Sequence, residues 1–528
     1  MNTPLHAVGS SRLMSRISRL IGVVLLVALV STSLARTQRT APHSRNLNTI
    51  FDLAALNGTN GFVITSGNVT QTAMGYAFAG NSDINGDGIV DFVVGDKQQS
   101  KCYVVFGTQH GFPANFSVSA LNGTNGFTIK GGPKDALSAS IAMADLNGDG
   151  FADVIVSAPY ASPSKDRLNA GQIYVIFGKR RPYPAILDVT HELNGTNGFM
   201  INGIAETDFA GQAVAAAGDL NGDGHTDLII GARGAHPNNL YMAGQAYIVF
   251  GRGHAKFDPV LELSKLNGTN GFIINGLRPK IQFGQSVSGL GDVDGDGLHD
   301  IIIGAHGDGI FEGQAYVIYG SKNPFPPVFD VSALDGSNGF VLDGPRIGSD
   351  FGYSVSGAGD IDNDGHADII VGAIDALNAN NTPVGAAYVI YGRKDFPASF
   401  NVTQLVGKNG FVIYGEALDD RFGCSVASAG RFNGDDYADI IVGATMNQPS
   451  GKAYILFGGP RQETPSIDAD RIGNMGVIIR GINRGDAIGN VVKSLGDLNH
   501  DGFEDVAIGG SGFNGVGLSK SFVVYGFA

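Results

Sequence analysis

Residues 219–227 read D-L-N-G-D-G-H-T-D, and the apolar run L-I-I-G-A follows at once. The same form, D-x-(N/D)-x-D-G-x-x-D, also begins at Asp83, Asp145, Asp292, Asp360 and Asp497. Several side-chain oxygens within nine residues repel one another unless a cation lies among them. Hard oxygen ligands at alternate positions, with a glycine for the sharp turn, are what a calcium loop requires. The six copies therefore predict both a metal and a repeat architecture.

The spacing of these acidic loops defines the repeat. A seventh copy begins at Arg431, where the leading aspartate is missing, and it fills the one gap in the series. Successive loops begin 62 to 74 residues apart, which is enough for four strands and their turns. Around residue 219 the unit contains strands expected over 199–203, 209–218, 228–232 and 245–251. The second of these is rich in small residues, as expected near a crowded axis, and the last two are apolar, as expected between neighbouring blades.

A turn signature, L-N-G-T-N-G-F, precedes the first strand of each unit. It begins at Leu56, Leu121, Leu193 and Leu266, with variants at Leu334 and Leu405 and a degraded copy near Ile472. The chain opens with such a turn and strand (51–65), whereas the final unit, which ends on 522–526, lacks its fourth strand. Pairing the two would close a ring and remove exposed edges. The sequence thus predicts an all-β, seven-bladed β-propeller over residues 49–528, with four-stranded antiparallel blades and an N-terminal strand completing the last blade.

The first 35 residues differ in kind from the repeats. Three arginines (Arg12, Arg16 and Arg19) precede the apolar stretch 20–30, and small residues follow at 33–35. This is the pattern of a signal peptide, and the apolar stretch is short for a membrane span. We expect a signal peptide over 1–35, a linker over 36–48 and a secreted or cell-surface protein, periplasmic or extracellular if bacterial. An uncleaved N-terminal anchor is the alternative.

Composition excludes several classes of protein. The formal charge of −14 leaves no basic patch for nucleic acid. Cys102 and Cys424 fall in different repeats and in apolar strands, so we expect buried small side chains and no disulfide framework.

Glycosylation would require a eukaryotic host. The eight N-x-(S/T) sequons lie at Asn57, Asn68, Asn115, Asn122, Asn194, Asn267, Asn380 and Asn401.

The repeat resembles the FG-GAP repeats of the integrin α-subunit β-propeller. The resemblance rests on a Phe-Gly pair before the loop and a Gly-Ala pair after it. These pairs occur as 283–284 with 304–305, 351–352 with 372–373, and 422–423 with 443–444. Blade one has Met74-Gly75 instead, and blade two has Leu137 where the glycine is expected. The resemblance extends from about residue 49 to the end of the chain.

The resemblance implies that calcium is bound through loop positions 1, 3, 5 and 9 and through the backbone carbonyl of position 7. An Asx-rich turn satisfied by its own hydrogen bonds is the alternative. The implied ligands are Asp83, Asn85, Asp87, Ile89 and Asp91 in blade one; Asp145, Asn147, Asp149, Phe151 and Asp153 in blade two; Asp219, Asn221, Asp223, His225 and Asp227 in blade three; Asp292, Asp294, Asp296, Leu298 and Asp300 in blade four; Asp360, Asp362, Asp364, His366 and Asp368 in blade five; and Asp497, Asn499, Asp501, Phe503 and Asp505 in blade seven.

The loop of blade six departs from this pattern. Arg431 replaces the first ligand, and Asp436 replaces the turn glycine. We expect this loop to hold no calcium. We also expect the Arg431 guanidinium to take the place of the ion and to pair with Asp435 or Asp439.

No catalytic constellation is evident: the histidines do not recur at metal-ligand spacing, and no G-x-S-x-G elbow occurs. The resemblance implies that ligands engage the face opposite the calcium loops. We therefore expect a non-catalytic protein that binds an extracellular protein or glycan through loops 157–170 and 231–243, with Tyr160, His236 and Tyr241 as contacts. A polysaccharide-acting, lyase-like enzyme and a structural envelope or matrix protein are the alternatives. Association with a surface partner is left open, and the tripeptide 484–486 (R-G-D) is read as a coincidence.

Overall fold

The structure, a computed structural model, describes residues 50–67, 73–253, 257–307, 309–447, 449–510 and 520–527. The predicted signal peptide, the predicted linker and the sequon at Asn68 lie outside these residues. Within the described ranges, no helix is long and apolar enough to cross a membrane.

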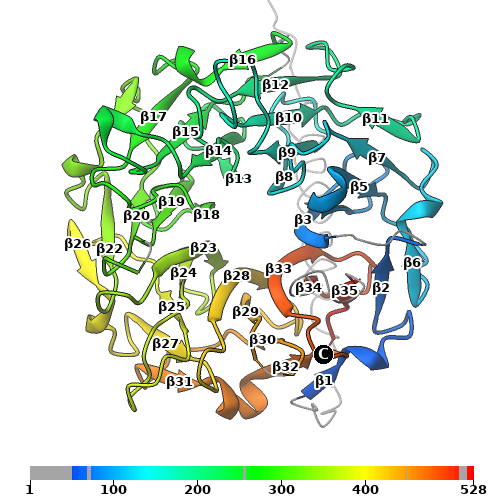
Figure 1. The fold of residues 1–528 in the computed structure, drawn as a ribbon. Coiled ribbons are helices and arrows are strands. Elements are labelled where there is room, and N and C mark those ends of the chain that lie inside the picture. The colour runs from blue at the N-terminus through cyan, green and yellow to red at the C-terminus, as the bar shows by residue number, and fades with distance from the viewer. Residues whose placement is uncertain are drawn as a thin grey trace, which may run out of the picture. The chain divides into compact units, whose positions relative to one another are not determined.

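Residues 48–527 form one compact unit of seven five-stranded sheets arranged around a central channel (Figure 1). In blades one to seven, the innermost strands are β3 (Met74–Ser82), β8 (Ile141–Ala144), β13 (Ala213–Gly218), β18 (Val287–Gly291), β23 (Phe351–Gly359), β28 (Phe422–Gly430) and β33 (Ile488–Gly496). The second strands are β4 (Asp91–Asp96), β9 (Asp153–Ala158), β14 (Asp227–Ala232), β19 (Asp300–Ala305), β24 (Asp368–Ala373), β29 (Asp439–Ala444) and β34 (Asp505–Gly510). The third strands are β5 (Lys101–Val105), β10 (Gln172–Ile176), β15 (Gln245–Val249), β20 (Gln314–Ile318), β25 (Ala386–Ile390), β30 (Lys452–Leu456) and β35 (Lys520–Val524).

The outer two strands of each blade come from later parts of the chain, except where the ring closes. The fourth strands are β7 (Gly126–Lys130), β12 (Gly198–Asn202), β17 (Gly271–Asn275), β22 (Gly339–Asp343), β27 (Gly410–Tyr414), β32 (Gly476–Arg480) and β2 (Gly61–Thr65). The fifth strands are β11 (Ile186–Asp188), β16 (Val260–Glu262), β21 (Val328–Phe329), β26 (Ser399–Asn401), β31 (Ser466–Asp468), β1 (Ile50–Asp52) and β6 (Asn115–Ser117). Short 3-10 helices occur at Leu53–Ala55, Lys97–Gln99, Val118–Ala120, Pro237–Asn239, Leu263–Lys265, Val331–Ala333, Val402–Gln404, Ala469–Arg471 and Gly473–Met475.

The predicted seven-bladed propeller is confirmed, but the prediction of four strands per blade is wrong. Each blade has a fifth, outermost strand of two or three residues that pairs in parallel with the fourth. In blade one, for example, Ile186 of β11 lies opposite Thr128 of β7. A strand this short shows no alternation of apolar and polar residues, so periodicity could not reveal it.

The turn that leads into each fourth strand has the local bonding that its sequence predicts. In the copy at Leu193, Asn194 Oδ1 accepts hydrogen bonds from Thr196 N at 2.9 Å and Thr196 Oγ1 at 2.6 Å. This Asx turn accounts for the recurring N-G-T residues without any glycan.

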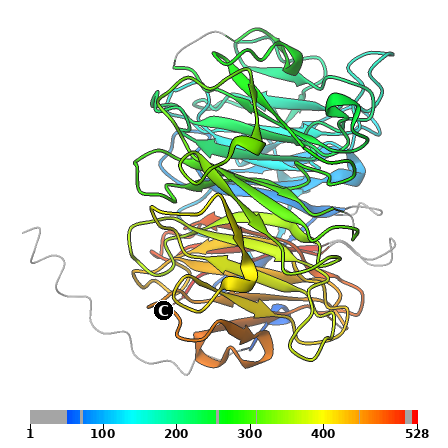
Figure 2. The same ribbon diagram turned by 90° about the vertical axis from the view of Figure 1, so that its left-hand side faces the viewer.

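The N-terminal segment closes the ring through two blades. As predicted, β2 pairs antiparallel with β35 and completes blade seven, with Gly61 opposite Val524. In addition, β1 pairs in parallel with β32 as the outer strand of blade six, with Ile50 opposite Ile478. Figure 1 shows these first strands beside the last ones at the point of closure. Figure 2 shows the ring from its side, with the connecting loops at its two faces.

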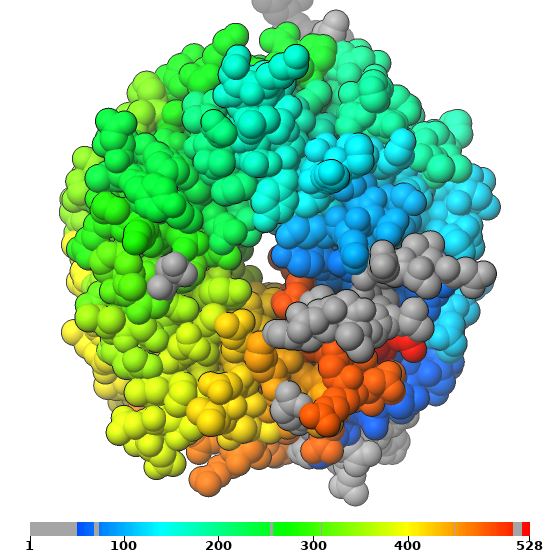
Figure 3. Space-filling model, in the orientation of Figure 1, coloured from blue at the N-terminus to red at the C-terminus, as the bar shows by residue number. Residues whose placement is uncertain are grey.

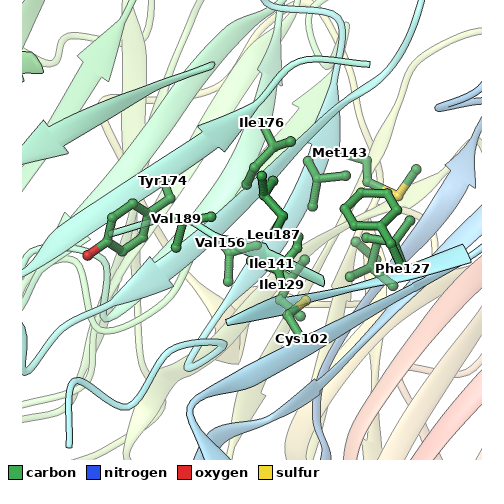
Figure 4. Packing of buried hydrophobic residues seen from close by; sticks show 14 of the residues in the cluster. Cys102, Phe127, Ile129, Ile141, Met143, Val156, Tyr174, Ile176, Leu187 and Val189 are labelled. Carbon is green, nitrogen blue, oxygen red and sulfur yellow. The ribbon is translucent and has the colours of Figure 1, made fainter. Parts of the chain in front are cut away.

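The hydrophobic core lies between neighbouring blades. Between blades one and two, Phe127, Ile129, Val156 and Tyr174 pack with no more than 1% of their surfaces exposed (Figure 4). Burying an apolar side chain of this size contributes about 1.5–3 kcal/mol. Cys102 is buried in the same cluster, as predicted, and its burial raises the pKa of the thiol.

Glycines allow the blades to approach one another at the inner strands. A Cβ at Gly443 would lie 1.9 Å from the carbonyl oxygen of Gly489, the glycine that begins the next blade's inner strand. The same close approach joins Gly231 to Gly284. Where blade two lacks the motif, one of the two facing residues is still a glycine. In blade two the residue at the glycine position is Ser138, with φ of 69° and facing Gly95, and not Leu137 as the sequence suggested.

The inner strands enclose the channel, whose mouth is visible at the centre of Figure 3. Two stretches of it, of about 450 and 220 Å³, are lined mainly by Gly, Ala, Ser and Val. Lys493 is the one lysine or arginine among these lining residues.

Candidate functional site

The acidic loops lie side by side on one face of the ring, because each joins the first strand of a blade to the second. Their backbones are linked from blade to blade. Ala152 N donates to Asp83 O at 2.9 Å, Ala367 N to Asp292 O at 2.8 Å, and Ala438 N to Asp360 O at 3.0 Å. The predicted ligands of six blades therefore share one face.

The ninth aspartate of each loop is buried and ties the loop to the third strand. Asp227 accepts hydrogen bonds from Leu220 N at 3.0 Å and Gly251 N at 2.9 Å, and it is fully buried. Burial raises the pKa of Asp227 to about 7, against the lowering effect of the two N–H groups. A pair of backbone bonds of this kind is made in all seven loops, although in blade six the donor within the loop is Asn433 N, one residue later than in the others; the acceptors are Asp91, Asp153, Asp227, Asp300, Asp368, Asp439 and Asp505.

The first aspartate accepts hydrogen bonds from the loop itself. Asp219 accepts from Gly222 N at 2.8 Å, Asp223 N at 3.0 Å and Gly224 N at 2.9 Å. The Asx-turn bonding considered as an alternative is therefore present. It does not use the carbonyl at position 7, since none of those six carbonyls accepts a hydrogen bond from another described residue.

Carboxylates converge most closely in blades four and five. Carboxylate oxygens of Asp292, Asp294 and Asp300 lie within 4.8 Å of one another, as do those of Asp360, Asp362 and Asp364. In addition, Asp362 Oδ1 is buried without a hydrogen-bond partner. Clustered oxygens with one buried and unsatisfied fit a hard cation such as Ca²⁺ better than they fit an empty turn.

The predicted pairing of Arg431 is wrong. The Arg431 side chain is exposed and makes no ion pair with Asp435 or Asp439. The loop keeps its shape through its backbone, because Gly434 N donates to Arg431 O at 3.1 Å, while Asn433 Nδ2 donates to Asp435 Oδ2 at 2.8 Å.

Two other arginines contact the acidic loops, and sequence reasoning missed both. Arg461 donates to Asp362 and Asp364 of blade five, and Arg181 Nη2 lies 2.9 Å from Asp87 Oδ2 of blade one. Both arginines follow the third strand of the next blade along the chain. No pattern within one repeat points to them, because each arginine contacts the loop of the blade before its own.

The opposite face is built from the loops between strands two and three and those between strands four and one. These loops are bonded to each other: Thr207 N donates to Leu168 O, and Lys280 N to Tyr241 O, both at 2.9 Å. Among the described residues, eight of the fourteen exposed large apolar side chains lie on these loops, namely Tyr160, Leu168, Tyr241, Leu277, Ile310, Ile347, Leu418 and Ile482.

The predicted contact residues lie on this face. Tyr160 is 38% exposed and packs edge-on against Phe209, and Tyr241 is 56% exposed and packs edge-on against His236. In the R-G-D tripeptide, Asp486 Oδ2 accepts from Asn483 N at 2.7 Å, so this carboxylate is already engaged within its own loop.

Comparison with known proteins identifies the repeat. A model described as "FG-GAP repeat" matches residues 138–176, 210–249, 283–319 and 351–390, and an "FG-GAP-like repeat" model matches 83–156. Integrin alpha-V of Gallus gallus is 30% identical over 247 residues, which are 45% of this chain and 20% of that protein. Integrin alpha-6 of Gallus gallus is 32% identical over 157 residues, 30% of this chain and 13% of that protein.

A relative of another kind aligns over more of the chain. Phosphatidylinositol-glycan-specific phospholipase D of Bos taurus is 24% identical over 388 residues, 71% of this chain and 43% of that protein. The chain thus spans less than half the length of each of these curated relatives. The chain contains FG-GAP repeats and resembles the integrin α propeller.

Proposed function

We propose that this FG-GAP repeat propeller is a secreted or cell-surface protein that binds an extracellular protein or glycan, without catalysis, through the face opposite its acidic loops. The observation that carries the proposal is the placement of eight exposed large apolar side chains on that face. Exposed aromatic and aliphatic groups on loops, held by a rigid scaffold, are typical of recognition surfaces.

Blades two and three are the part of this face best suited to a ligand. Tyr160 and Tyr241 present ring surface to solvent, and Lys97 Nζ lies 5.8 Å from the Tyr160 ring and 2.9 Å from the Tyr76 hydroxyl. Rings beside a cation offer both stacking and charge, which suits a protein side chain or an acidic sugar.

Calcium in the six complete loops is the second part of the proposal. The clustered carboxylates of blades four and five and the free carbonyls at position 7 support it. When bound, Ca²⁺ would neutralise these carboxylates and link loop residues that otherwise repel one another. Ions bound only to the native state stabilise it by mass action.

Binding is tested with immobilised extracellular matrix proteins and a glycan array, probed with calcium-loaded protein. We expect retention of a defined ligand that falls at least tenfold in the double variant Tyr160→Ala/Tyr241→Ala. Ile186→Ala is the matched control, because Ile186 is 60% exposed but lies on an outer strand. No retained ligand, or an equal loss in the control, would contradict the proposal.

Calcium binding is tested by melting the protein with and without EDTA. We expect a marked fall in Tm on chelation, since each site gives about 2.7 kcal/mol at a hundredfold excess over its Kd. An unchanged melting curve would reject structural calcium.

An enzyme is the second candidate, favoured by the similarity to the phospholipase D over 71% of the chain. Turnover of a glycosylphosphatidylinositol or of an acidic polysaccharide by the purified protein, lost on loop mutation, would support it over the binding function.

A further inference from the structure

Arg461 reaches from blade six into the acidic loop of blade five. Its Nε donates to Asp362 Oδ2, and its Nη2 donates to Asp364 Oδ2. The backbone beside it is held against the same loop, because Gly459 N donates to Ile361 O at 2.9 Å. The Asp362 side chain is 1% exposed and the Arg461 side chain is 41% exposed, so the contact is enclosed on the side of Asp362.

Blade four provides a natural comparison. Its loop has the same four aspartates at positions 1, 3, 5 and 9 as blade five, namely Asp292, Asp294, Asp296 and Asp300. None of these four forms an ion pair with a lysine or arginine among the described residues. Arg393, in the connection that abuts this loop, lies over the Phe396 ring at 3.9 Å instead.

Blade one shows a weaker version of the same contact. Arg181 bonds only one carboxylate of the loop, Asp87, at 2.9 Å, and its guanidinium also lies 4.8 Å from the centre of the Phe106 ring. A single exposed ion pair contributes little stabilisation. A guanidinium bonded to two carboxylates, one of them enclosed, competes effectively with a metal ion for those carboxylates.

The guanidinium occupies two of the oxygens that a cation would need. It leaves Asp362 Oδ1, which is buried without a partner, and the carboxylate of Asp360. A divalent cation in this loop must therefore share or displace a resident positive charge, and close positive charges repel strongly where water is scarce.

We propose that Arg461 is a built-in counter-cation of the blade-five loop, which makes this loop a calcium site of lower affinity than the loop of blade four, whose four ligand aspartates are the same. The inference rests on the proposed calcium function. The two loops would empty in order as calcium falls, blade five before blade four.

Terbium luminescence can distinguish the two loops. The chain has no tryptophan, so excited tyrosines are the energy donors. Tyr391 lies beside the blade-five loop, with its ring centre 5.2 Å from the Arg461 guanidinium, and burial together with the charges of Asp362 and Asp368 raises its pKa. Burial together with the charges of Asp294 and Asp300 likewise raises the pKa of Tyr319 at the blade-four loop. Tyr391→Phe and Tyr319→Phe therefore assign each luminescence component to one loop when Tb³⁺ is titrated into the full chain.

We expect the Tyr391 component to half-saturate at a Tb³⁺ concentration at least tenfold above that of the Tyr319 component. Arg461→Gln should lower that concentration towards the blade-four value, and calcium should reverse both signals. Arg393→Gln is the matched control and should shift neither component. The blade-four component also reports that each variant is folded.

Two kinds of result would overturn the inference, and the second would also overturn the proposed calcium binding. Equal affinities in the native chain, or an Arg461→Gln variant with an unshifted Tyr391 component, would reject the role of Arg461 alone. Absence of tyrosine-sensitised luminescence at both loops would reject calcium binding itself, and this inference with it.

Discussion

The ninth aspartate of each acidic loop has a structural task that is separate from any ion. Asp439 shows this, because its loop in blade six lacks the first ligand and yet Asp439 still accepts two backbone bonds, from Gly458 N at 2.9 Å and from Asn433 N at 3.0 Å. The sequence pattern assigns positions 1, 3, 5 and 9 the same role. In the structure, positions 1 and 5 lie near solvent and position 9 lies in the core.

Substitutions at positions 5 and 9 should therefore behave differently. Asp223→Ala should remove one calcium site, leave the others titratable and change the Tm in EDTA little, since Asp223 is exposed. Asp227→Ala should lower the Tm even in EDTA, because two buried N–H groups lose their acceptor at about 1–3 kcal/mol each. Thermal melting with and without calcium measures both. Equal Tm values for the two variants in EDTA would refute the distinction.

Asp208, on the opposite face, should make stability depend on pH. It is 3% exposed and accepts from Ala205 N at 2.8 Å, and burial raises its pKa to about 6, with His236 acting in the other direction. A raised folded-state pKa means that the unfolded chain ionises first. This group's contribution to stability therefore falls as pH rises from about 4 to 6 and is constant above that, at about 1.4 kcal/mol per pKa unit.

Asp208→Asn tests this linkage by urea unfolding at pH 5 and pH 8. We expect the variant to gain stability relative to the native chain as pH rises between these values. A stability difference that is independent of pH would count against the buried carboxylate as its source.

At the scale of elements, the inner strands are joined across blades by serine hydroxyls. Val214 N donates to Ser140 Oγ at 3.0 Å, and Val492 N donates to Ser425 Oγ at 3.1 Å. The repeated glycines also bring neighbouring blades together. The Gly-Ala pair of one blade's second strand lies against the Phe-Gly pair at the start of the next blade's inner strand. The motif that identifies the repeat is thus a packing requirement between blades.

Ser425→Ala should destabilise the interface between blades six and seven by about 1–2 kcal/mol, because the Val492 N–H group loses its partner. Ser288→Ala is the control. Ser288 also lies on an inner strand, that of blade four, but its hydroxyl bonds only the carbonyl of the adjacent Gly289. Chemical denaturation measures both. A control as damaging as Ser425→Ala would show that the cross-blade bond is not the cause.

At the scale of the whole molecule, closing the ring of seven blades encloses the central channel. Seven inner strands meet at the axis, and their lining is nearly uncharged apart from Lys493. Among the described residues the Lys493 ammonium group has no hydrogen-bond or ion-pair partner; its side chain is exposed to the channel, and desolvation by the surrounding wall lowers the pKa of the ammonium group. Blades three and six have Ala215 and Ala427 at the same position of the inner strand.

Lys493→Met should raise the Tm slightly or leave it unchanged, because it removes an unpaired and partly desolvated charge while keeping the volume. The gain should shrink with added salt, which screens the charge in the native chain. Scanning calorimetry at low and high NaCl measures this. A large fall in Tm would show that the ammonium group is stabilised in the channel by a partner such as an anion.

Repeated local patterns in the sequence were enough to predict the blade number, the positions of the acidic loops, the turns and the closure by β2. Each of these is a pattern within about ten residues, or a spacing between copies, so no knowledge of the third dimension is needed. The fifth strands escaped prediction because two or three residues carry no period.

Only the tertiary structure decided which side chains meet across blades. Arg461 contacts Asp364 although 97 residues separate them, and Arg431, within its own loop, makes no such contact with that loop's aspartates. Sequence proximity favoured Arg431, but the ring places the end of one blade's third strand against the loop of the blade before it. Contacts between repeats depend on how the blades are stacked, and a linear pattern within each repeat does not contain that information.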